Sequence, residues 1–218
     1  MPLFDLFIQF RFRYLKNLGN SIIDFFSQIK GLFRTFGIID VVDILFVAID
    51  VAEMKKTIDA TCKACAEMSD AKIGALIVFE NDTLLGDIIA SGTIVDGTPS
   101  KELIGNIFYP KSPLHDGAMV IRGSSIYAAG CILPLTKNND LSSQLGTRHR
   151  AALGLSEQSD AIVFVVSEER GEISCAVNGT LRRDISTGDM RDILTQQYIP
   201  DNISSDDKII SKLKRRFK

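Results

Sequence analysis

The sequence has little of what several kinds of functional site require. Histidine occurs only twice and cysteine only four times in 218 residues, so a zinc centre built from several such ligands has few candidates. There is no recognisable cleavable signal peptide and no dense cysteine framework, which favours a reducing, cytoplasmic setting for the folded part. The formal net charge is only −2. A nucleic-acid partner is therefore not expected, and phosphate chemistry must depend on a local cluster of positive charge.

The chain also lacks a long uncharged apolar run. Residues 38–51 are strongly apolar, but they contain three aspartates, whereas a membrane-spanning helix needs about 20 predominantly apolar residues. The preceding residues mix apolar side chains with lysine and arginine. Two interpretations stay open: amphipathic helices that lie on a membrane surface or on a partner, which the basic excess slightly favours, and helices that cover the globular domain.

One cysteine pair, Cys62 and Cys65, has the Cys-x-x-Cys spacing that zinc and redox sites use. It lies in a segment where Ile58, both cysteines and Ala66 recur on one helical face, and the chain has no second such pair. The pattern favours two small apolar helix residues over metal or redox chemistry.

The composition changes along the chain divide it into three parts. Residues 1–51 are apolar and basic, residues 52–200 alternate helix and strand patterns, and residues 201–218 form a polar tail that ends in basic residues. The middle part predicts an α/β domain with a central mixed, mainly antiparallel sheet flanked by helices. Helices are expected over 51–69, 101–108, 147–157 and 187–198, and strands over 73–80, 118–122, 126–133, 161–167 and 172–178, with one or two short strands within 83–96.

Three constellations in this domain carry candidate chemistry. His115 and Asp116 precede Gly117 at the mouth of a strand; Asp is a hard ligand for Mg²⁺ or Mn²⁺ and His suits Mn²⁺ better, although Asp116 could simply cap loop amides. Glu168, with Ser167 and Glu169, follows a buried apolar strand, where ligands of α/β sheets bind. A solvated turn is an equally ordinary interpretation of that segment.

The second constellation is the run Gly146-Thr147-Arg148-His149-Arg150 at the opening of a helix. Free amides and the positive end of the helix dipole attract anions, Thr147 adds a hydroxyl donor, and each guanidinium can fork onto phosphate oxygens. Arginine at this end opposes helix stability, a local conflict typical of a site. The run favours phosphate binding over a solvated basic turn.

In chain order the segments IGALIVFE, SPLHDGAMVI, CILPL and LGTRHRAALGLSEQSDAIVFVVSEERGEISCAVNG resemble the diadenylate cyclase domain, whose signatures are a DGA and an RHR motif. The similarity covers about two thirds of the chain. Within the family, the sequence resembles the membrane-bound bacterial class, and the resemblance implies that the transmembrane region of that class is largely missing from this chain. Since both motifs occur together with their flanking residues, the resemblance is highly specific.

The resemblance implies an enzyme, a nucleotidyltransferase that condenses two ATP molecules into cyclic di-AMP, a second messenger, with release of two pyrophosphates. Each protomer of a face-to-face homodimer would hold one ATP, and each ribose 3′-OH would attack the other α-phosphate. Catalytic roles fall on Asp116, Arg148, His149 and Arg150. Metal ligands for Mn²⁺ or Mg²⁺ would be His115, Asp116 and Glu168.

The same resemblance implies an ATP site in which adenine lies near Leu133 and residues 74–76. Ile132 stands where some relatives have an aromatic residue. The full set of expected ATP-binding residues is Gly74, Leu76, Asp116, Gly117, Ala118, Leu133, Gly146, Thr147, Arg148 and Glu168. Regulatory proteins and a membrane surface are further partners that the family implies. The alternatives are a catalytically silent nucleotide-binding sensor and an adaptor that works through residues 1–51.

Overall fold

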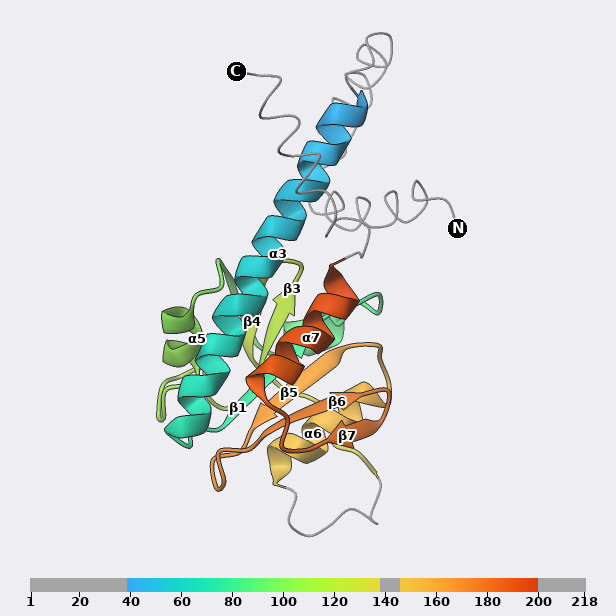
Figure 1. Cartoon of the computed structure of the whole chain (residues 1–218). Helices are drawn as coiled ribbons and strands as arrows, with labels where there is room; N and C mark the ends of the chain where they lie inside the picture. The colour runs from blue at the N-terminus through green and yellow to red at the C-terminus, as the bar shows by residue number, and fades with distance from the viewer. Residues whose placement is uncertain (1–38, 138–145, 200–218) are drawn as a thin grey trace. The chain divides into compact units, whose positions relative to one another are not determined.

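The computed structural model describes residues 39–137 and 146–199 (Figure 1). By internal packing the chain divides into residues 1–49 and 50–218. The proposed amphipathic segments before residue 39, the loop 138–145 and the basic tail 201–218 lie outside the described residues. In the two described ranges, no helix is both long enough and apolar enough to span a bilayer.

The described elements alternate between helix and strand. The helices are α3 (Ile39–Asp70), α4 (Gly86–Ala90), α5 (Lys101–Ile107), α6 (Thr147–Ser156) and α7 (Thr187–Tyr198). The strands are β1 (Ala75–Phe79), β2 (Thr93–Gly97), β3 (Ala118–Arg122), β4 (Ser125–Cys131), β5 (Ile162–Val166), β6 (Ile173–Val177) and β7 (Thr180–Arg182). Ser100 caps α5 by accepting from the Leu103 amide at 3.1 Å, as its position before the helix predicts.

The seven strands form one sheet in the order β2-β4-β3-β1-β5-β6-β7. Only β1 and β3 run parallel, and every other neighbouring pair is antiparallel. The predicted fold class, a mixed and mainly antiparallel sheet flanked by helices, is therefore confirmed. The predicted hairpin between residues 118–122 and 126–133 is also present, as β3 and β4.

Two elements differ from the expectation. Of the one or two short strands expected within residues 83–96, one is present as β2. Residues 86–90 form α4 instead of a second strand, because Leu85 and Ile89, four residues apart, both pack into the core cluster. The strand β7 was missed. Asn178 and Gly179 both have positive φ, of 49° and 71°, and this Asn-Gly pair is a strong hairpin signal that leads the chain directly into β7.

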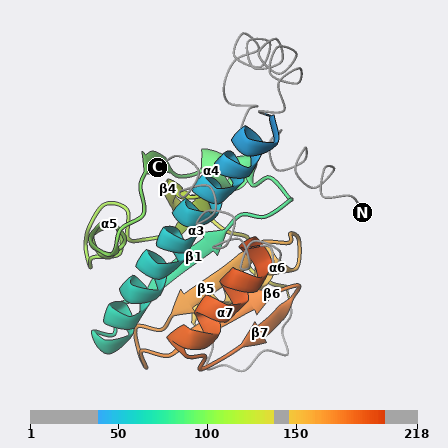
Figure 2. The same cartoon turned by 45° about the horizontal axis from the view of Figure 1, so that its top comes forward.

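Helices cover both faces of the sheet. α3 and α7 lie side by side on one face and α6 lies on the other (Figures 1 and 2). On the first face Phe79 packs edge-on against Phe164, and Arg191 of α7 forms an ion pair with Asp59 of α3 at 2.8 Å. On the second face alternate strand residues and α6 share one hydrophobic cluster, which includes Leu76, Val78, Ala118, Val120, Val163, Val165, Ala152 and Leu155.

The Cys62 and Cys65 side chains are buried in α3 and belong to the core. Burial raises the pKa of the Cys62 thiol to about 11, so it stays protonated and is a poor nucleophile at neutral pH. The prediction that this pair consists of small apolar helix residues is confirmed.

The segment that follows β4 holds α6 in place. The Thr136 amide donates to the Arg150 carbonyl at 3.0 Å, and the Thr136 hydroxyl donates to Glu157 at 2.6 Å. Gly154 packs directly on the same segment, since a Cβ there would lie 2.2 Å from the Pro134 carbonyl oxygen. The absence of a side chain at Gly154 therefore sets how closely α6 approaches this backbone.

Replacing Gly154 by alanine should lower the free energy of unfolding by about 1–3 kcal/mol, the usual cost of overpacking. Urea titration measures it. Gly105→Ala in α5 is the matched control, because nothing lies within 4 Å of its added Cβ; it should gain up to about 1 kcal/mol from helix propensity. Similar unfolding curves for the two variants would contradict the packing argument.

Candidate active site

Three strand ends meet at one edge of the sheet. Because β1 and β3 are parallel, with Ile77 opposite Met119, the residues just before β3, which include Asp116, reach the same edge of the sheet as Gly74, just before β1. Because β5 is antiparallel to β1, with Ala75 opposite Val166, Glu168 follows the end of β5 at the same edge. The strand pairing thus gathers residues from three separate parts of the sequence.

The N-terminal turn of α6 reaches this edge through Arg148. Its Nη1 donates to Oε2 of Glu168 at 2.7 Å. Gly74 lies directly beneath: a Cβ there would sit 2.6 Å from Nη1 of Arg148 and 2.9 Å from Oε2 of Glu168. The three predicted residues Gly74, Arg148 and Glu168 are therefore in one cluster, and any side chain at Gly74 would displace the ion pair.

The start of α6 offers amide donors beside this cluster. Its N-cap is Gly146, which has no side chain to cap the first turn, and no acidic residue lies in that turn. The amides of His149 and Arg150 already donate to the Gly146 carbonyl, at 3.1 and 3.2 Å, so the donors left for a ligand are the amides of Thr147 and Arg148. Thr147 is also exposed. Among the residues that the structure describes, this helix start has no side-chain cap, and its exposed hydroxyl and cationic side chain suit an anionic ligand.

The Asp116 carboxylate is exposed and, among the residues that the structure describes, it has no hydrogen bond or ion pair. Next to it, Nδ1 of His115 lies 2.6 Å from the Ser112 carbonyl oxygen. Since a carbonyl oxygen can only accept, Nδ1 carries the proton, and Nε2 is left as the acceptor or metal-binding atom. The carboxylate of Asp116 and Nε2 of His115 can therefore bind a ligand without first losing a hydrogen bond within the protein.

Gly117, which follows this pair, has φ of +125°, and a Cβ there would lie 2.6 Å from the Gly130 carbonyl carbon. A side chain at this position would collide with the backbone of β4, so the close approach of β4 requires glycine.

His149 lies apart from this cluster. Its side chain is buried, and Nε2 is 3.3 Å from the hydroxyl of the fully buried Ser174 on β6. Burial, together with the nearby Arg183, lowers the pKa of His149, so the neutral imidazole is favoured. The side chain of Arg150 is exposed. The structure therefore brings Arg148 of the RHR motif into the cluster, and it directs its two neighbours elsewhere.

The expected adenine walls are core residues. Leu76 is 4% exposed and Leu133 7%, and both belong to the cluster beneath α6. Ala118, another expected ATP-binding residue, is fully buried in the same cluster. Ile132, next to Leu133, is 71% exposed. The assignment of Leu76 and Leu133 to adenine binding stays a prediction. In the segment around Leu133, the apolar side chains that face solvent are Ile132 and, at 47% exposed, Leu135.

Comparison with known proteins is consistent with this geometry. A family model described as "DisA bacterial checkpoint controller nucleotide-binding" (DAC) matches residues 62–181, more than half of the chain. The chain belongs to the DAC family.

Individual DAC relatives agree with the match. The cyclic di-AMP synthase CdaA of Bacillus subtilis is 44% identical over 144 residues, which are 66% of this chain and 53% of that protein. The chain thus matches about half the length of this curated relative. A cysteine double mutant of DacA from Staphylococcus aureus has a crystal structure with a TM-score of 0.65 and 48% identity, covering 66% of this chain and 97% of that one. A hypothetical membrane spanning protein from Bacillus cereus has a TM-score of 0.56 and 46% identity, covering 58% and 62%.

The donor set of this DAC site fits a divalent cation that is shared with a substrate. Among the described residues, no three His, Cys, Asp or Glu side chains are already gathered around a metal-sized space. Mg²⁺ and similar ions are commonly held by one or two carboxylates plus substrate phosphates. The carboxylate of Asp116 and the Glu168 oxygen that Arg148 does not contact can supply the carboxylates. Nε2 of His115 adds a nitrogen donor, which suits Mn²⁺ better than Mg²⁺.

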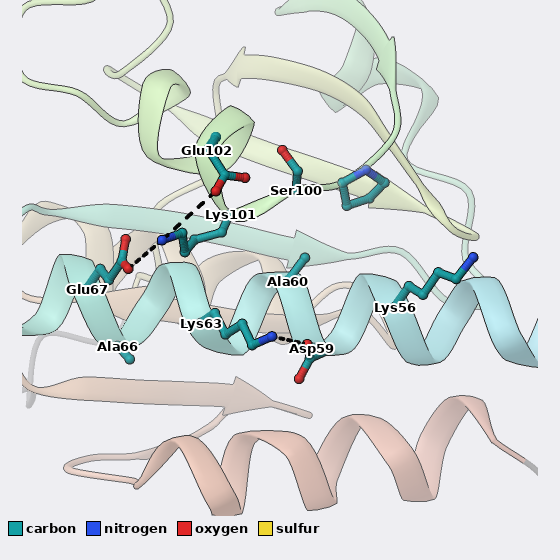
Figure 3. Close-up of a pocket in the computed structure, with 10 residues that line it drawn as sticks. Lys56, Asp59, Ala60, Lys63, Ala66, Glu67, Ser100, Lys101 and Glu102 are labelled. Carbon is teal, nitrogen blue, oxygen red and sulfur yellow. Dashed lines mark hydrogen bonds and ion pairs between the residues drawn. The ribbon is translucent and has the colours of Figure 1, made fainter.

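An open groove between α3 and α5 lies apart from the DAC motifs (Figure 3). Its charges are mostly paired: Lys101 contacts Glu67 at 2.8 Å and Lys63 contacts Asp59 at 2.7 Å. None of the predicted site residues lines it. This groove is not a candidate for the nucleotide site.

The buried His149 predicts a pH dependence of stability. Its pKa is lowered in the folded state, so the unfolded chain binds a proton more readily. Stability associated with this residue is full above the ordinary histidine pKa of about 6.5 and is lost as the pH falls below it.

His149→Gln should remove that component. The melting temperature of the variant should fall less steeply than that of the wild type between about pH 7 and pH 5. Parallel profiles for the two proteins would contradict the assigned burial effect.

Proposed function

We propose that this protein is a diadenylate cyclase, which condenses two ATP molecules into cyclic di-AMP and releases two pyrophosphates. The observation that carries the proposal is the meeting of Asp116, the Arg148–Glu168 pair and the uncapped start of α6 at one edge of the sheet. This arrangement supplies a proton acceptor and a phosphate cradle together. The name of CdaA, a cyclic di-AMP synthase that is 44% identical, supports the choice of reaction.

Each residue of the cluster has a separate task in this reaction. Asp116 accepts the proton of the ribose 3′-OH as its oxygen attacks the α-phosphate of the other nucleotide. Arg148 and the first amides of α6 bind the α-phosphate oxygens, where negative charge is concentrated during the transfer. Thr147 donates its hydroxyl to the same group. The pyrophosphate leaves with the bonding electron pair, and a second, equivalent transfer closes the ring.

The remaining predicted residues take supporting roles. His149, which is buried against Ser174, anchors the first turn of α6 so that Arg148 faces the sheet edge. Arg150 is exposed and is available to phosphate oxygens or to a facing protomer. The exposed Ile132 forms the apolar contact for adenine, above the buried Leu133.

A bound Mn²⁺ or Mg²⁺, held by His115, Asp116 and Glu168, would supply charge neutralisation at the phosphate groups. Glu168 would contribute the oxygen that does not contact Arg148, so the ion pair between the two side chains would be kept. The other N–H groups of the guanidinium would stay available for phosphate.

The reaction requires two sites that face each other, because each nucleotide attacks the one opposite. The active species is therefore a homodimer with one ATP in each protomer. We place this catalytic domain in the cytoplasm. A relative in Bacillus cereus is described as a membrane spanning protein. This supports an attachment of the present protein to the membrane through residues outside the described ranges, where regulatory proteins could also bind.

Asp116→Asn should reduce product formation by about two to four orders of magnitude, because the amide cannot accept the 3′-OH proton. The assay incubates protein with ATP and Mn²⁺ and resolves the nucleotides by chromatography. Asp192→Asn, an exposed aspartate on α7, is the matched control and should retain wild-type activity. Absence of cyclic di-AMP from the wild type with Mn²⁺ and with Mg²⁺ would refute the proposed reaction.

A dimeric active species predicts a concentration effect. At high dilution the specific activity should fall with enzyme concentration, because dissociated protomers hold ATP without a partner nucleotide. Initial rates over a dilution series measure this. Strict proportionality between rate and enzyme concentration throughout the dilute range would contradict a dissociable dimer.

A further inference from the structure

We propose that the C-terminal end of α3 positions the Arg148–Glu168 pair, and that Ser69 and Gly171 are the positioning residues that transmit this constraint. The inference rests on the proposed function, since its effect is measured at that site. Neither residue belongs to the predicted catalytic set. Both lie where α3 touches the turn between β5 and β6.

The contact between the two residues is close and specific. The Ser69 hydroxyl donates to the Gly171 carbonyl at 2.5 Å. Gly171 has φ of +77°, and a Cβ there would lie 2.4 Å from the Ser69 carbonyl oxygen. Only glycine combines this backbone conformation with this approach to the helix end. In Figures 1 and 2 the orange turn between β5 and β6 lies next to the end of α3.

The turn that Gly171 closes carries Glu168. The Gly171 amide donates to the Ser167 carbonyl at 2.8 Å, and the Ser167 amide donates to the Glu172 carbonyl at 3.0 Å. Glu168 therefore belongs to a short hydrogen-bonded loop whose far side is held on α3. A shift of Gly171 relative to the helix must shift the base of the Glu168 side chain.

The same helix end also fixes Gly74. α3 ends with Lys72 in the left-handed region, at φ of 52°. The amides of Lys72 and Ile73 turn back to the carbonyls of Ser69 and Met68 at 3.1 and 2.8 Å. These two hydrogen bonds form a Schellman-type helix end, which fixes the backbone that leads directly to Gly74. The end of α3 thus fixes the position of Gly74 and also the position of the loop that carries Glu168.

The ion pair needs such support because it cannot maintain its own geometry. The Glu168 side chain is 63% exposed and that of Arg148 is 25% exposed, and exposed pairs contribute little free energy. Catalytic positioning is far more sensitive than stability, since a displacement of about 1 Å can cost about a hundredfold in rate. The anchor on α3 therefore matters more for activity than for folding.

The test compares two glycines in hairpin turns that follow one another along the chain. Gly171→Ala introduces the clash with Ser69, whereas Gly179→Ala imposes similar strain, at φ of +71°, in the β6–β7 turn at the opposite end of the sheet. Both should lose stability. Only Gly171→Ala should lower kcat, by about ten- to a hundredfold, and raise the Mn²⁺ concentration that gives half-maximal activity.

A milder pair of variants keeps the test valid if Gly171→Ala does not fold. Ser69→Ala removes the hydrogen bond and should also raise the Mn²⁺ concentration that gives half-maximal activity. Ser69→Thr retains the hydroxyl and should keep that concentration at the wild-type value. Titration with a non-hydrolysable ATP analogue in Mn²⁺ gives a readout independent of turnover. If the wild type makes cyclic di-AMP but both Ser69→Ala and Gly171→Ala match the Gly179→Ala profile, the positioning role is wrong. If the wild type makes none, the proposed function itself fails.

Discussion

The pairing of β1 with a parallel β3 on one side and an antiparallel β5 on the other is the constraint on which the site depends. Strand direction decides which end of each strand reaches a given edge. With these directions the residues before β1, before β3 and after β5 all meet at one edge. If β3 ran antiparallel to β1, Asp116 would lie at the opposite edge, roughly 17 Å away for a strand of five residues.

In the first turn of α6, the three side chains of the RHR motif point in three different directions. Successive helical residues point about 100° apart, so adjacent side chains cannot share one surface. Arg148 faces the sheet edge, His149 enters the core beside Ser174, and Arg150 faces solvent. The motif is contiguous in sequence, but its members have different environments, and their chemistry differs accordingly.

Positive charge at the start of a helix is locally unfavourable, because it adds to the positive end of the helix dipole. Here Glu168 offsets part of that charge through its contact with Arg148, and an anionic nucleotide would offset more. The same feature that weakens the isolated helix therefore prepares it for phosphate. Such a conflict between local stability and site chemistry is what functional residues often show.

Local patterns predicted much of the fold. The bounds of β3 and α7 and the cap of α5 followed from turn residues, capping residues and apolar periodicity. The short apolar stretch of α4 was misassigned because a few residues cannot separate helical from strand spacing. β7 was missed because it has only three residues, of which two are polar, and it lies at the edge of the sheet. Side-chain directions within the RHR motif could not be predicted, since they depend on which face of α6 meets the sheet.

By itself the sequence determined the chemical inventory: an aspartate beside a histidine, a cluster of cations at a helix start, and a carboxylate after a buried strand. These types and their spacing are local properties of the chain. Only the tertiary structure decided which of them meet. It joined Gly74, Arg148 and Glu168, placed His149 in the core, and set Gly171 against Ser69, 102 positions away in sequence. Such contacts depend on strand order and helix docking, which no local pattern encodes.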